Sequence, residues 1–266
     1  IAVVEGDAEV TQNLIQKDID YIFFTGSTSV GKTIMKSAAE HLIPITLELG
    51  GKNPCIVDHE IDMNVTVKRI VWGKFFNAGQ TCIAPDYLLV HKEIKDIFLD
   101  KLVATIHEFY GENVRENQDY SHIINEKHFK RLTYLMQEGT LNTGGCKDID
   151  HLFISPTVIT DMDDDSALMQ EEIFGPILPV LFYDNLDGVI TKLRNKPKSL
   201  ALYFFSRNQQ KQKCVLIHTS SGSVCINGTI HLIMSPKLPF GGVGQSGMGQ
   251  YHGKVSFITF SHKKSV

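Results

Sequence analysis

The sequence lacks any apolar run of the length that a membrane span requires, and it carries no excess of positive charge. Its 26 Lys and Arg residues face 30 Asp and Glu residues, which gives a formal net charge of -4. Nucleic-acid backbones and anionic membrane surfaces are therefore unfavourable partners. A signal-peptide pattern is absent as well, so we expect a cytoplasmic protein that binds no nucleic acid.

Cysteine is scarce, and its spacing suggests no pairing. The five cysteines are Cys55, Cys82, Cys146, Cys214 and Cys225. An odd number without a C-x-x-C pair argues against a disulfide framework or a zinc ribbon, and it favours a reducing compartment. The eleven histidines are scattered and form no H-x-x-x-H pattern, so the sequence predicts no metal site.

The first 47 residues alternate between short strand-like and helix-like segments. The apolar run Tyr21–Phe24 is typical of a buried parallel strand, and the polar turn 25–31 follows it. A short helix is predicted before this strand over Val10–Lys17, and another after it over Lys32–His41. The alternation predicts an α/β protein with a doubly wound parallel sheet.

The same alternation continues from Glu48 with longer segments. A strand at 45–47 closes the first unit, and the predicted strands after it are 55–57, 87–90, 157–159, 200–205 and 223–226, with predicted helices at 62–77, 93–109, 125–137, 186–195 and 209–219. These segments form a second α/β unit of about domain size. A last strand is expected at Phe257–Phe260, after a glycine-rich stretch.

Cys82 lies in a stretch that presents a side chain to a cavity. Apolar residues keep helical spacing as far as Ala78, Gly79 ends the predicted helix, and Pro85 prevents it from resuming. Cys82 therefore sits on a tight turn among small and polar residues. Taken alone, a cysteine is more often a buried and inert packing residue, and the turn does not decide between the two interpretations.

Glu48 ends a predicted strand and precedes Gly50 and Gly51. Glycines let a ligand approach the backbone closely, and a carboxylate at such a place is a candidate general base. A surface glutamate in a loop is the alternative interpretation.

The turn before the second predicted helix reads Gly26-x-x-x-x-Gly31-Lys32-Thr33, which matches the P-loop pattern letter for letter. It predicts a phosphate group at a helix N-terminus, and taken alone it indicates a P-loop NTPase. No strand ends convincingly in the magnesium-binding Asp that such an enzyme needs. A plain turn between strand and helix is the remaining alternative.

Two further segments are unusual. Glu171–Pro176 combines adjacent carboxylates with Phe174 and a rigid turn. The carboxylates could bind ribose hydroxyls and Phe174 could stack on a ring; a helix end with charges in solvent is the alternative.

Five glycines lie between residues 241 and 249, directly after Pro239 and Phe240. Bulky apolar residues are rare in flexible linkers, so this segment is expected to lie against a ligand or another backbone.

Together these motifs resemble the aldehyde dehydrogenase superfamily. That family has a phosphate-contacting F-T-G-S turn, an E-L-G-G-K segment, a G-Q-x-C segment, E-E-I-F-G-P and P-F-G-G, and all five occur here in that order. The wording at 79–87, 238–249 and 251–262 is similar to the class 3 branch, which includes fatty and aromatic aldehyde dehydrogenases. The resemblance spans essentially the whole chain. The match of residues 26–33 to the P-loop pattern is therefore interpreted as a coincidence within the family's own turn.

The resemblance implies the remnant of a Rossmann-like NAD-binding domain plus an α/β catalytic domain of the aldehyde dehydrogenase fold. Residues 1–47 would be the C-terminal part of the NAD-binding domain, 48–233 the catalytic domain, and 234–266 a Gly-rich return segment with an oligomerisation strand. The family's N-terminal part, with an Asn of the oxyanion hole, has no counterpart in this sequence. We therefore expect the 266-residue chain alone to be inactive and poorly stable.

The resemblance also assigns roles to residues. Cys82 would be the nucleophile and Glu48 the general base. The residues expected at the cofactor are Gly26, Ser27, Gly31, Leu49, Glu172 and Phe174. Phe240 would line the substrate entrance. The cofactor would be NAD, with NADP possible. The partners would be a medium- or long-chain aliphatic or aromatic aldehyde and a second copy in a homodimer. A P-loop NTPase and a non-catalytic relative remain the alternatives.

Overall fold

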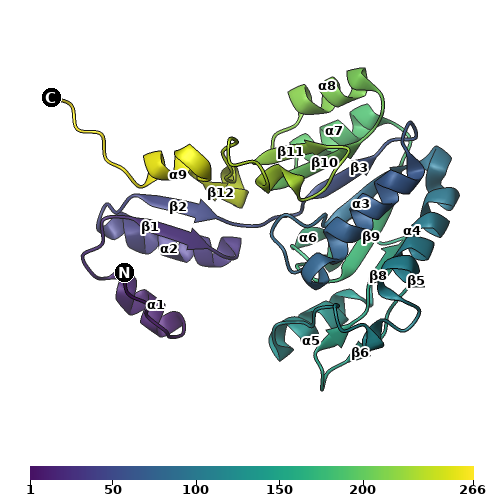
Figure 1. Cartoon of the computed structure of the whole chain (residues 1–266), viewed down its shortest axis with the longest axis horizontal. Coiled ribbons are helices and arrows are strands. Elements are labelled where there is room, and N and C mark those ends of the chain that lie inside the picture. The colour runs from purple at the N-terminus through teal and green to yellow at the C-terminus, as the bar shows by residue number, and fades with distance from the viewer.

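The computed structural model describes residues 1–266 and consists of two lobes that lie side by side (Figure 1). The smaller lobe has a three-stranded sheet in the order β1-β2-β12, and the larger lobe has a seven-stranded sheet in the order β11-β10-β3-β4-β9-β8-β5. A separate pair, β6-β7, belongs to the larger lobe. The predicted α/β class is confirmed.

The smaller lobe begins with α1 (Ala8–Ile15), β1 (Ile22–Thr25), α2 (Thr28–Glu40) and β2 (Ile45–Glu48). Strands β1 and β2 are parallel, as predicted. Helix α2 begins one turn earlier than predicted, because the Ser27 side chain caps it by accepting a hydrogen bond from the Val30 N–H at 3.4 Å. Most of the polar turn is therefore the first turn of this helix.

The glycine-rich segment returns to the smaller lobe and adds a strand there. β12 (Gly247–Met248) runs antiparallel to β2, with Gly247 opposite Glu48. A Cβ at Gly247 would lie 2.3 Å from the Leu47 carbonyl oxygen, and the φ of Gly247 is 150°. Only glycine permits the backbone to approach β2 this closely. The glycine-rich segment is therefore an ordered strand packed against β2 and not a flexible linker.

The predicted strand at Phe257–Phe260 is wrong. Helix α9 (Gly253–Thr259) covers most of it, and no strand follows. Short apolar runs do not distinguish a helix from a strand, and tertiary packing decides here. Phe260 lies against the smaller lobe, with its ring 5.4 Å from that of Tyr21 and 5.9 Å from that of Phe23. The expected oligomerisation strand therefore has no counterpart in the structure.

The larger sheet is parallel except for its edge strand β5, which is antiparallel to β8. Its strands are β3 (Pro54–Val57), β4 (Tyr87–His91), β5 (Thr140–Thr143), β8 (Thr157–Thr160), β9 (Ile177–Tyr183), β10 (Ala201–Phe205) and β11 (Ser223–Ile226), and the separate pair is β6 (Lys147–Asp148) and β7 (Phe153–Ile154). β9 lies near the middle of the sheet and was not predicted. It contains Pro179, a residue type that normally argues against a central strand.

Helices cover both faces of this sheet (Figure 1). Their bounds are α3 (Met63–Phe75), α4 (Lys95–Tyr110), α5 (Glu126–Leu135), α6 (Ala167–Gln170), α7 (Leu186–Arg194) and α8 (Gln209–His218), with 3₁₀ turns η1 (Phe76–Gly79), η2 (Lys92–Ile94), η3 (Val114–Glu116), η4 (His231–Ile233) and η5 (Gly244–Ser246). Alternate residues of β3 point to opposite faces of the sheet. Cys55 and Val57 pack with α3 and α4 on one face, and Ile56 packs with α7 and α8 on the other.

The outer edge of β1 has no partner strand, and Phe23 on it is 38% exposed. Unpaired edges with exposed apolar side chains favour association between chains. We expect the 266-residue chain alone to associate in a concentration-dependent way, which sedimentation velocity measures. Phe23→Lys should reduce the association.

The matched control is Phe257→Lys, because Phe257 is 76% exposed but belongs to helix α9 and not to the unpaired strand β1. A chain that stays monodisperse at high concentration, or an association that responds only to Phe257→Lys, contradicts the assignment of the edge.

Candidate active site

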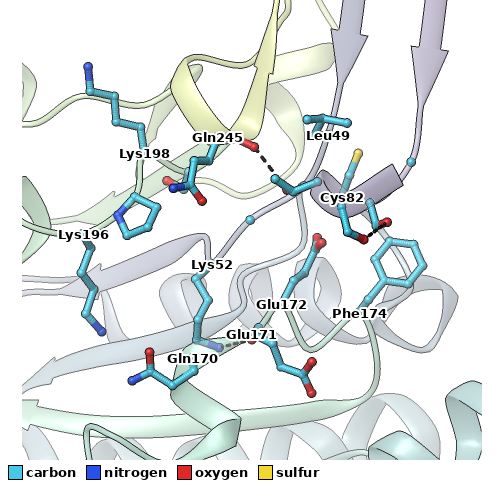
Figure 2. Close-up of a pocket in the computed structure, with 18 of the residues that line it drawn as sticks. Leu49, Lys52, Cys82, Gln170, Glu171, Glu172, Phe174, Lys196, Lys198 and Gln245 are labelled. Atoms are coloured by element: carbon cyan, nitrogen blue, oxygen red, sulfur yellow. Dashed lines mark hydrogen bonds between the residues drawn. The ribbon is translucent and has the colours of Figure 1, made fainter. Parts of the chain in front are cut away.

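Residues of both lobes line a cavity of about 1150 Å³ (Figure 2). Seven of the nine predicted site residues lie on its wall, so the sequence motifs converge on one place: Gly26, Ser27, Glu48, Leu49, Cys82, Glu172 and Phe174.

The other two predicted residues lie off the wall. Gly31 is buried in α2, where a Cβ would lie 2.7 Å from Cδ2 of Leu49, so this glycine lets the helix approach Leu49. Phe240 is only 3% exposed and stacks on His252 at 5.4 Å between ring centroids. Phe240 thus packs in the core, and the structure does not bring it to the cavity surface.

The turn that carries Cys82 is shaped by backbone conformation. Helix α3 ends at Phe75 and not at Gly79 as predicted, because Asn77 and Ala78 adopt left-handed φ values of 52° and 51°. Gly79 follows with a φ of 72°, and a Cβ there would lie 2.2 Å from the Gly175 carbonyl oxygen. The turn therefore rests directly on the backbone of the Glu171–Pro176 segment.

Asn53 fixes the same turn from the other side. Its Nδ2 donates to the carbonyl oxygens of Cys82 at 2.8 Å and of Ala84 at 3.0 Å. Its Oδ1 accepts from the Ala201 N–H at 2.9 Å, and the side chain is 1% exposed. One buried amide thus ties the Cys82 turn to the start of β10. The G-G-K-N segment contains this residue, but sequence reasoning did not single it out.

The environment of Cys82 holds its thiol in the neutral form. Burial raises the pKa of Cys82 to about 11, and the charges of Glu48 and Glu172 act in the same direction. The backbone N–H groups of Cys82 and Ile83 oppose this rise. Cys82 therefore needs a proton acceptor before its sulfur can attack.

Glu48 is the last residue of β2 and is 2% exposed. Both of its carboxyl oxygens are buried and have no well-aligned hydrogen-bond partner. Burial raises the pKa of Glu48 to about 7, and the nearby Tyr251 hydroxyl partly offsets the rise. A carboxyl group of this kind exchanges a proton readily near neutral pH, as a general base requires.

Glu172 also lines the cavity (Figure 2). Burial and the charge of Asp86 raise the pKa of Glu172 to about 7, while the Gly51 N–H, Lys52 and Arg131 oppose the rise. A Cβ at Gly50 would lie 2.2 Å from each Glu172 carboxyl oxygen. A side chain at residue 50 would displace this carboxyl group from its place.

A buried ion pair holds the Glu171–Pro176 segment in place. The Lys52 ammonium pairs with Asp86 and donates to the carbonyl oxygens of Leu168 at 2.7 Å and Glu171 at 2.9 Å. Asp86 in turn accepts from the Ile173 N–H at 2.9 Å. The sequence analysis gave no role to Lys52 or Asp86, although both lie inside the quoted motifs.

Lys74 is a second feature that the motifs did not reveal. It lies in the last turn of α3 and is 1% exposed. Burial lowers the pKa of Lys74 to about 8; Asp86 and Glu172 oppose this, and Lys52 reinforces it. Lys74 is thus a buried ammonium whose charge interacts with the carboxylates of Asp86 and Glu172, and Glu172 lines the cavity.

The cavity wall suits a phosphate-containing cofactor. The N-terminus of α2, from Ser27 to Val30, lines it, and free N–H groups at a helix start favour an anion. The Thr28 hydroxyl donates to the Gln245 carbonyl oxygen at 3.2 Å, which braces this turn against the glycine-rich segment. Lys32, which a P-loop needs at the phosphates, is exposed and does not line the cavity.

Comparison with known proteins identifies the family of the chain. The profile of the aldehyde dehydrogenase family matches residues 1–266, so the chain belongs to this family. The chain is 51% identical over 267 residues to 4,4'-diaponeurosporen-aldehyde dehydrogenase of Staphylococcus aureus. The aligned region covers 100% of this chain and 58% of that protein. It is 48% identical over 263 residues to the dimeric NADP-preferring aldehyde dehydrogenase of Mus musculus, with coverage of 99% and 58%.

Solved structures have the same fold. The substrate-bound Staphylococcus aureus AldH superimposes with a TM-score of 0.95 at 48% identity, over 99% of this chain and 59% of that one. An NAD-dependent aldehyde dehydrogenase from Sinorhizobium meliloti superimposes with a TM-score of 0.88 at 29% identity, over 96% of this chain and 52% of that one.

A sequence relative confirms the resemblance to the class 3 branch. Mouse aldehyde dehydrogenase family 3 member A2 is 48% identical over 99% of this chain and 54% of its own length.

The chain spans a little over half the length of these relatives. None of its helices combines the length and the apolar character that a membrane crossing needs.

Replacing Asn53 tests how the Cys82 turn is held. Asn53→Ala leaves two carbonyl oxygens and one N–H without this partner, so we expect a loss of about 2–4 kcal/mol in the free energy of unfolding, measured with urea. Alkylation of Cys82 by iodoacetamide should become faster, because the turn loosens.

The control is Asn113→Ala, because Asn113 is exposed and its side chain bonds only Glu116. A change within about 0.5 kcal/mol is expected there. If Asn53→Ala behaves like this control in both measurements, the amide does not position the turn.

Proposed function

We propose that the protein containing this chain oxidises aldehydes to carboxylic acids with NAD, or alternatively NADP, as the electron acceptor. The observation that supports this most directly is the presence of the Cys82 thiol and the unpaired Glu48 carboxyl group on one cavity wall. Their charges influence each other, since Glu48 raises the pKa of Cys82. A nucleophile and a base in one cavity are the parts that acyl transfer through a thioester needs.

In the proposed reaction the Cys82 thiol loses its proton to solvent, and its sulfur bonds to the aldehyde carbon while the carbonyl π electrons move to oxygen, which gives the oxyanion of a thiohemiacetal. The Cys82 N–H contributes to the stabilisation of the resulting oxyanion. A bound nicotinamide cofactor would supply the hydride acceptor, and the thiohemiacetal that has lost its hydride is a thioester on Cys82. Glu48 then takes a proton from a water molecule, whose oxygen attacks the thioester and releases the carboxylic acid and the thiol.

The cofactor contacts follow from the cavity wall. Gly26 and Ser27 are proposed to contact the pyrophosphate at the start of α2. Glu172 is proposed to accept hydrogen bonds from the nicotinamide ribose, with Leu49 and Phe174 beside the nicotinamide. Gly31 shapes the packing of α2, and Phe240 supports the segment behind the cavity.

The substrate is proposed to be a medium- or long-chain aliphatic or an aromatic aldehyde. The name of the Staphylococcus aureus relative indicates a long polyene aldehyde, which is in keeping with this class. A homodimer is proposed from the name of the dimeric mouse relative. We infer a cytoplasmic protein and expect no NAD-linked turnover from residues 1–266 alone; robust turnover by that purified chain would overturn this expectation.

Two other functions are less well supported. A P-loop NTPase requires Lys32 at the phosphates, and Lys32 faces solvent. A non-catalytic relative would leave Cys82 unreactive toward aldehyde and alkylating agents.

Substitution of the two proposed catalytic residues has separable effects. Cys82→Ala should abolish NADH formation in the full-length protein, because no thiohemiacetal forms. Glu48→Gln should keep a stoichiometric burst of NADH and lower the steady-state rate by about 10²–10⁴-fold, because only thioester hydrolysis loses its base. Stopped-flow absorbance at 340 nm separates the two phases (the wavelength at which NADH absorbs).

Cys146→Ala serves as the matched control, because Cys146 is exposed and outside the cavity. Normal turnover in Cys82→Ala, or loss of turnover in Cys146→Ala, would contradict the assignment.

The pH dependence of the steady-state rate reports on Glu48. Its active form as a base is the carboxylate, and its pKa of about 7 places half of the protein in that form at neutral pH. Where hydrolysis limits the rate, turnover should rise about tenfold per pH unit below 7 and level off above it. The rate of the Glu48→Gln variant should not show this rise with pH. A wild-type rate that is flat from pH 5 to 8 contradicts the role.

A further inference from the structure

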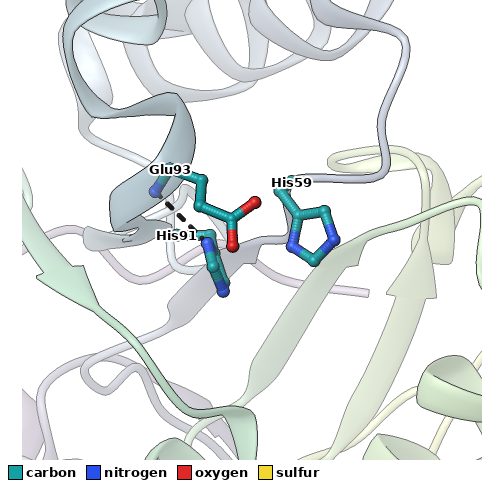
Figure 3. Close-up of side chains that lie close together, drawn as sticks. All are labelled: His59, His91 and Glu93. Atoms are coloured by element: carbon teal, nitrogen blue, oxygen red, sulfur yellow. Dashed lines mark hydrogen bonds between the residues drawn. The ribbon is translucent and has the colours of Figure 1, made fainter.

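A cluster of metal-ligating side chains lies outside the cavity (Figure 3). It consists of His59, His91 and Glu93, whose ligand atoms all lie within 4.8 Å of one another. The pairing of Val57 with Val90 in the parallel strands β3 and β4 brings the residues that follow them to one edge of the sheet. The sequence showed no histidine pattern because the topology, and not local spacing, brings these residues together.

We propose that these three side chains bind a divalent transition-metal ion of the zinc type. Two imidazoles and one carboxylate are ligands that Zn²⁺ accepts in tetrahedral sites, with water in the fourth position. Mg²⁺ and Ca²⁺ prefer oxygen ligands throughout, so the histidines select against them.

A carboxylate behind His59 supports this assignment. Asp58 Oδ1 lies 3.3 Å from His59 Nδ1, and Asp58 is 2% exposed. Asp58 is itself held by the Ser206 hydroxyl at 2.7 Å and by the Lys211 ammonium at 2.9 Å. The charge of Asp58 favours a proton on Nδ1, and the nearest carboxylate oxygen to Nε2, that of Glu60, lies 3.8 Å away, so no hydrogen bond engages Nε2. His59 Nδ1 is buried and makes no well-aligned hydrogen bond.

His91 has only one weak competing interaction. Its Nδ1 accepts from the Glu93 N–H at 3.3 Å, which is long for such a bond. The ring lies 4.6 Å from that of His59 and 5.2 Å from that of Tyr183, measured between centroids, so packing already orients it. A metal ion has to displace little to engage this imidazole.

A cation can reach the cluster from solvent. His91 and Asp58 also line a surface hollow of about 550 Å³. The carboxylates of Asp58, Asp184 and Asp187 and a single ammonium, that of Lys211, line it as well. Lys211 pairs with Asp58 and Lys92 pairs with Asp184, so Asp187 is the lining carboxylate that no ion pair neutralises and that favours the approach of a cation.

The proposed metal site is remote from the reaction. Pro54 and Tyr87 begin β3 and β4 and line the active-site cavity, whereas His59 and His91 lie at the opposite ends of these strands. A strand of four or five residues spans about 15 Å. The metal would therefore link the loop before α3 to the turn η2 and stabilise the fold without taking part in aldehyde oxidation.

The test uses Zn²⁺ alone as the probe. Because thiolates also bind zinc, isothermal titration is performed on the Cys82→Ala full-length protein. We expect one saturable Zn²⁺ site and a rise in Tm of about 5 °C at a hundredfold excess over Kd. His91→Gln and Glu93→Gln should each weaken binding at this site by about 100-fold or more. Glu93 is exposed, so its replacement does not threaten folding.

Glu40→Gln is the control for the loss of a surface carboxylate, because Glu40 is exposed and lies on α2. It should leave the titration unchanged. In the protein with Cys82 intact, Glu93→Gln and chelator should leave aldehyde oxidation unchanged, so this result is independent of the proposed reaction. Absence of a saturable Zn²⁺ site, or binding that survives both His91→Gln and Glu93→Gln, would overturn the proposal.

Discussion

The burial of the Glu48 carboxyl group without a well-aligned partner is the constraint on which the site depends. Leaving a carboxyl group in such a place is unfavourable, and the fold maintains it by strand pairing on both sides of β2. β1 flanks it on one side, and on the other Gly247 approaches so closely that no larger residue fits. The result is a carboxyl group whose pKa lies at about 7, where it can act as a base.

The remainder of the site consists of backbone segments in direct contact, and glycines permit each contact. Gly79 rests on the Gly175 carbonyl, and Gly50 leaves room for the Glu172 carboxyl group. Asn53 then fixes the Cys82 carbonyl by hydrogen bonding. Side chains from segments far apart in the chain thus converge on one cavity, because rigid backbone contacts and not flexible loops carry them. This arrangement provides the preorganisation that catalysis by positioning and electrostatics requires.

The sequence predicted the α/β class and seven of the residues that line the cavity because each motif encodes a local geometry: a strand end at Glu48, a polar turn between a strand and a helix at Gly26 and Ser27, a turn around Cys82. Features decided by distant neighbours were not predictable in this way. Phe257–Phe260 is mostly helical because Phe260 packs on β1, Phe240 is buried by residues that follow it, and the pKa of Lys74 depends on its burial and on the charges of Asp86, Lys52 and Glu172. The central strand β9 was not predicted, and it contains Pro179, a residue type that weakens the pattern of a central strand.

The most direct test of the proposed chemistry is to look for the covalent intermediate itself. Cleavage after Lys74 and Lys92 releases the peptide Phe75–Lys92, in which Cys82 is the sole cysteine. Full-length Glu48→Gln protein, mixed with aldehyde and NAD and quenched in acid, should yield this peptide with the mass of the aldehyde less two hydrogens added. An unmodified peptide alongside stoichiometric NADH, or the same mass on another cysteine, would contradict Cys82 as the residue that carries the acyl group.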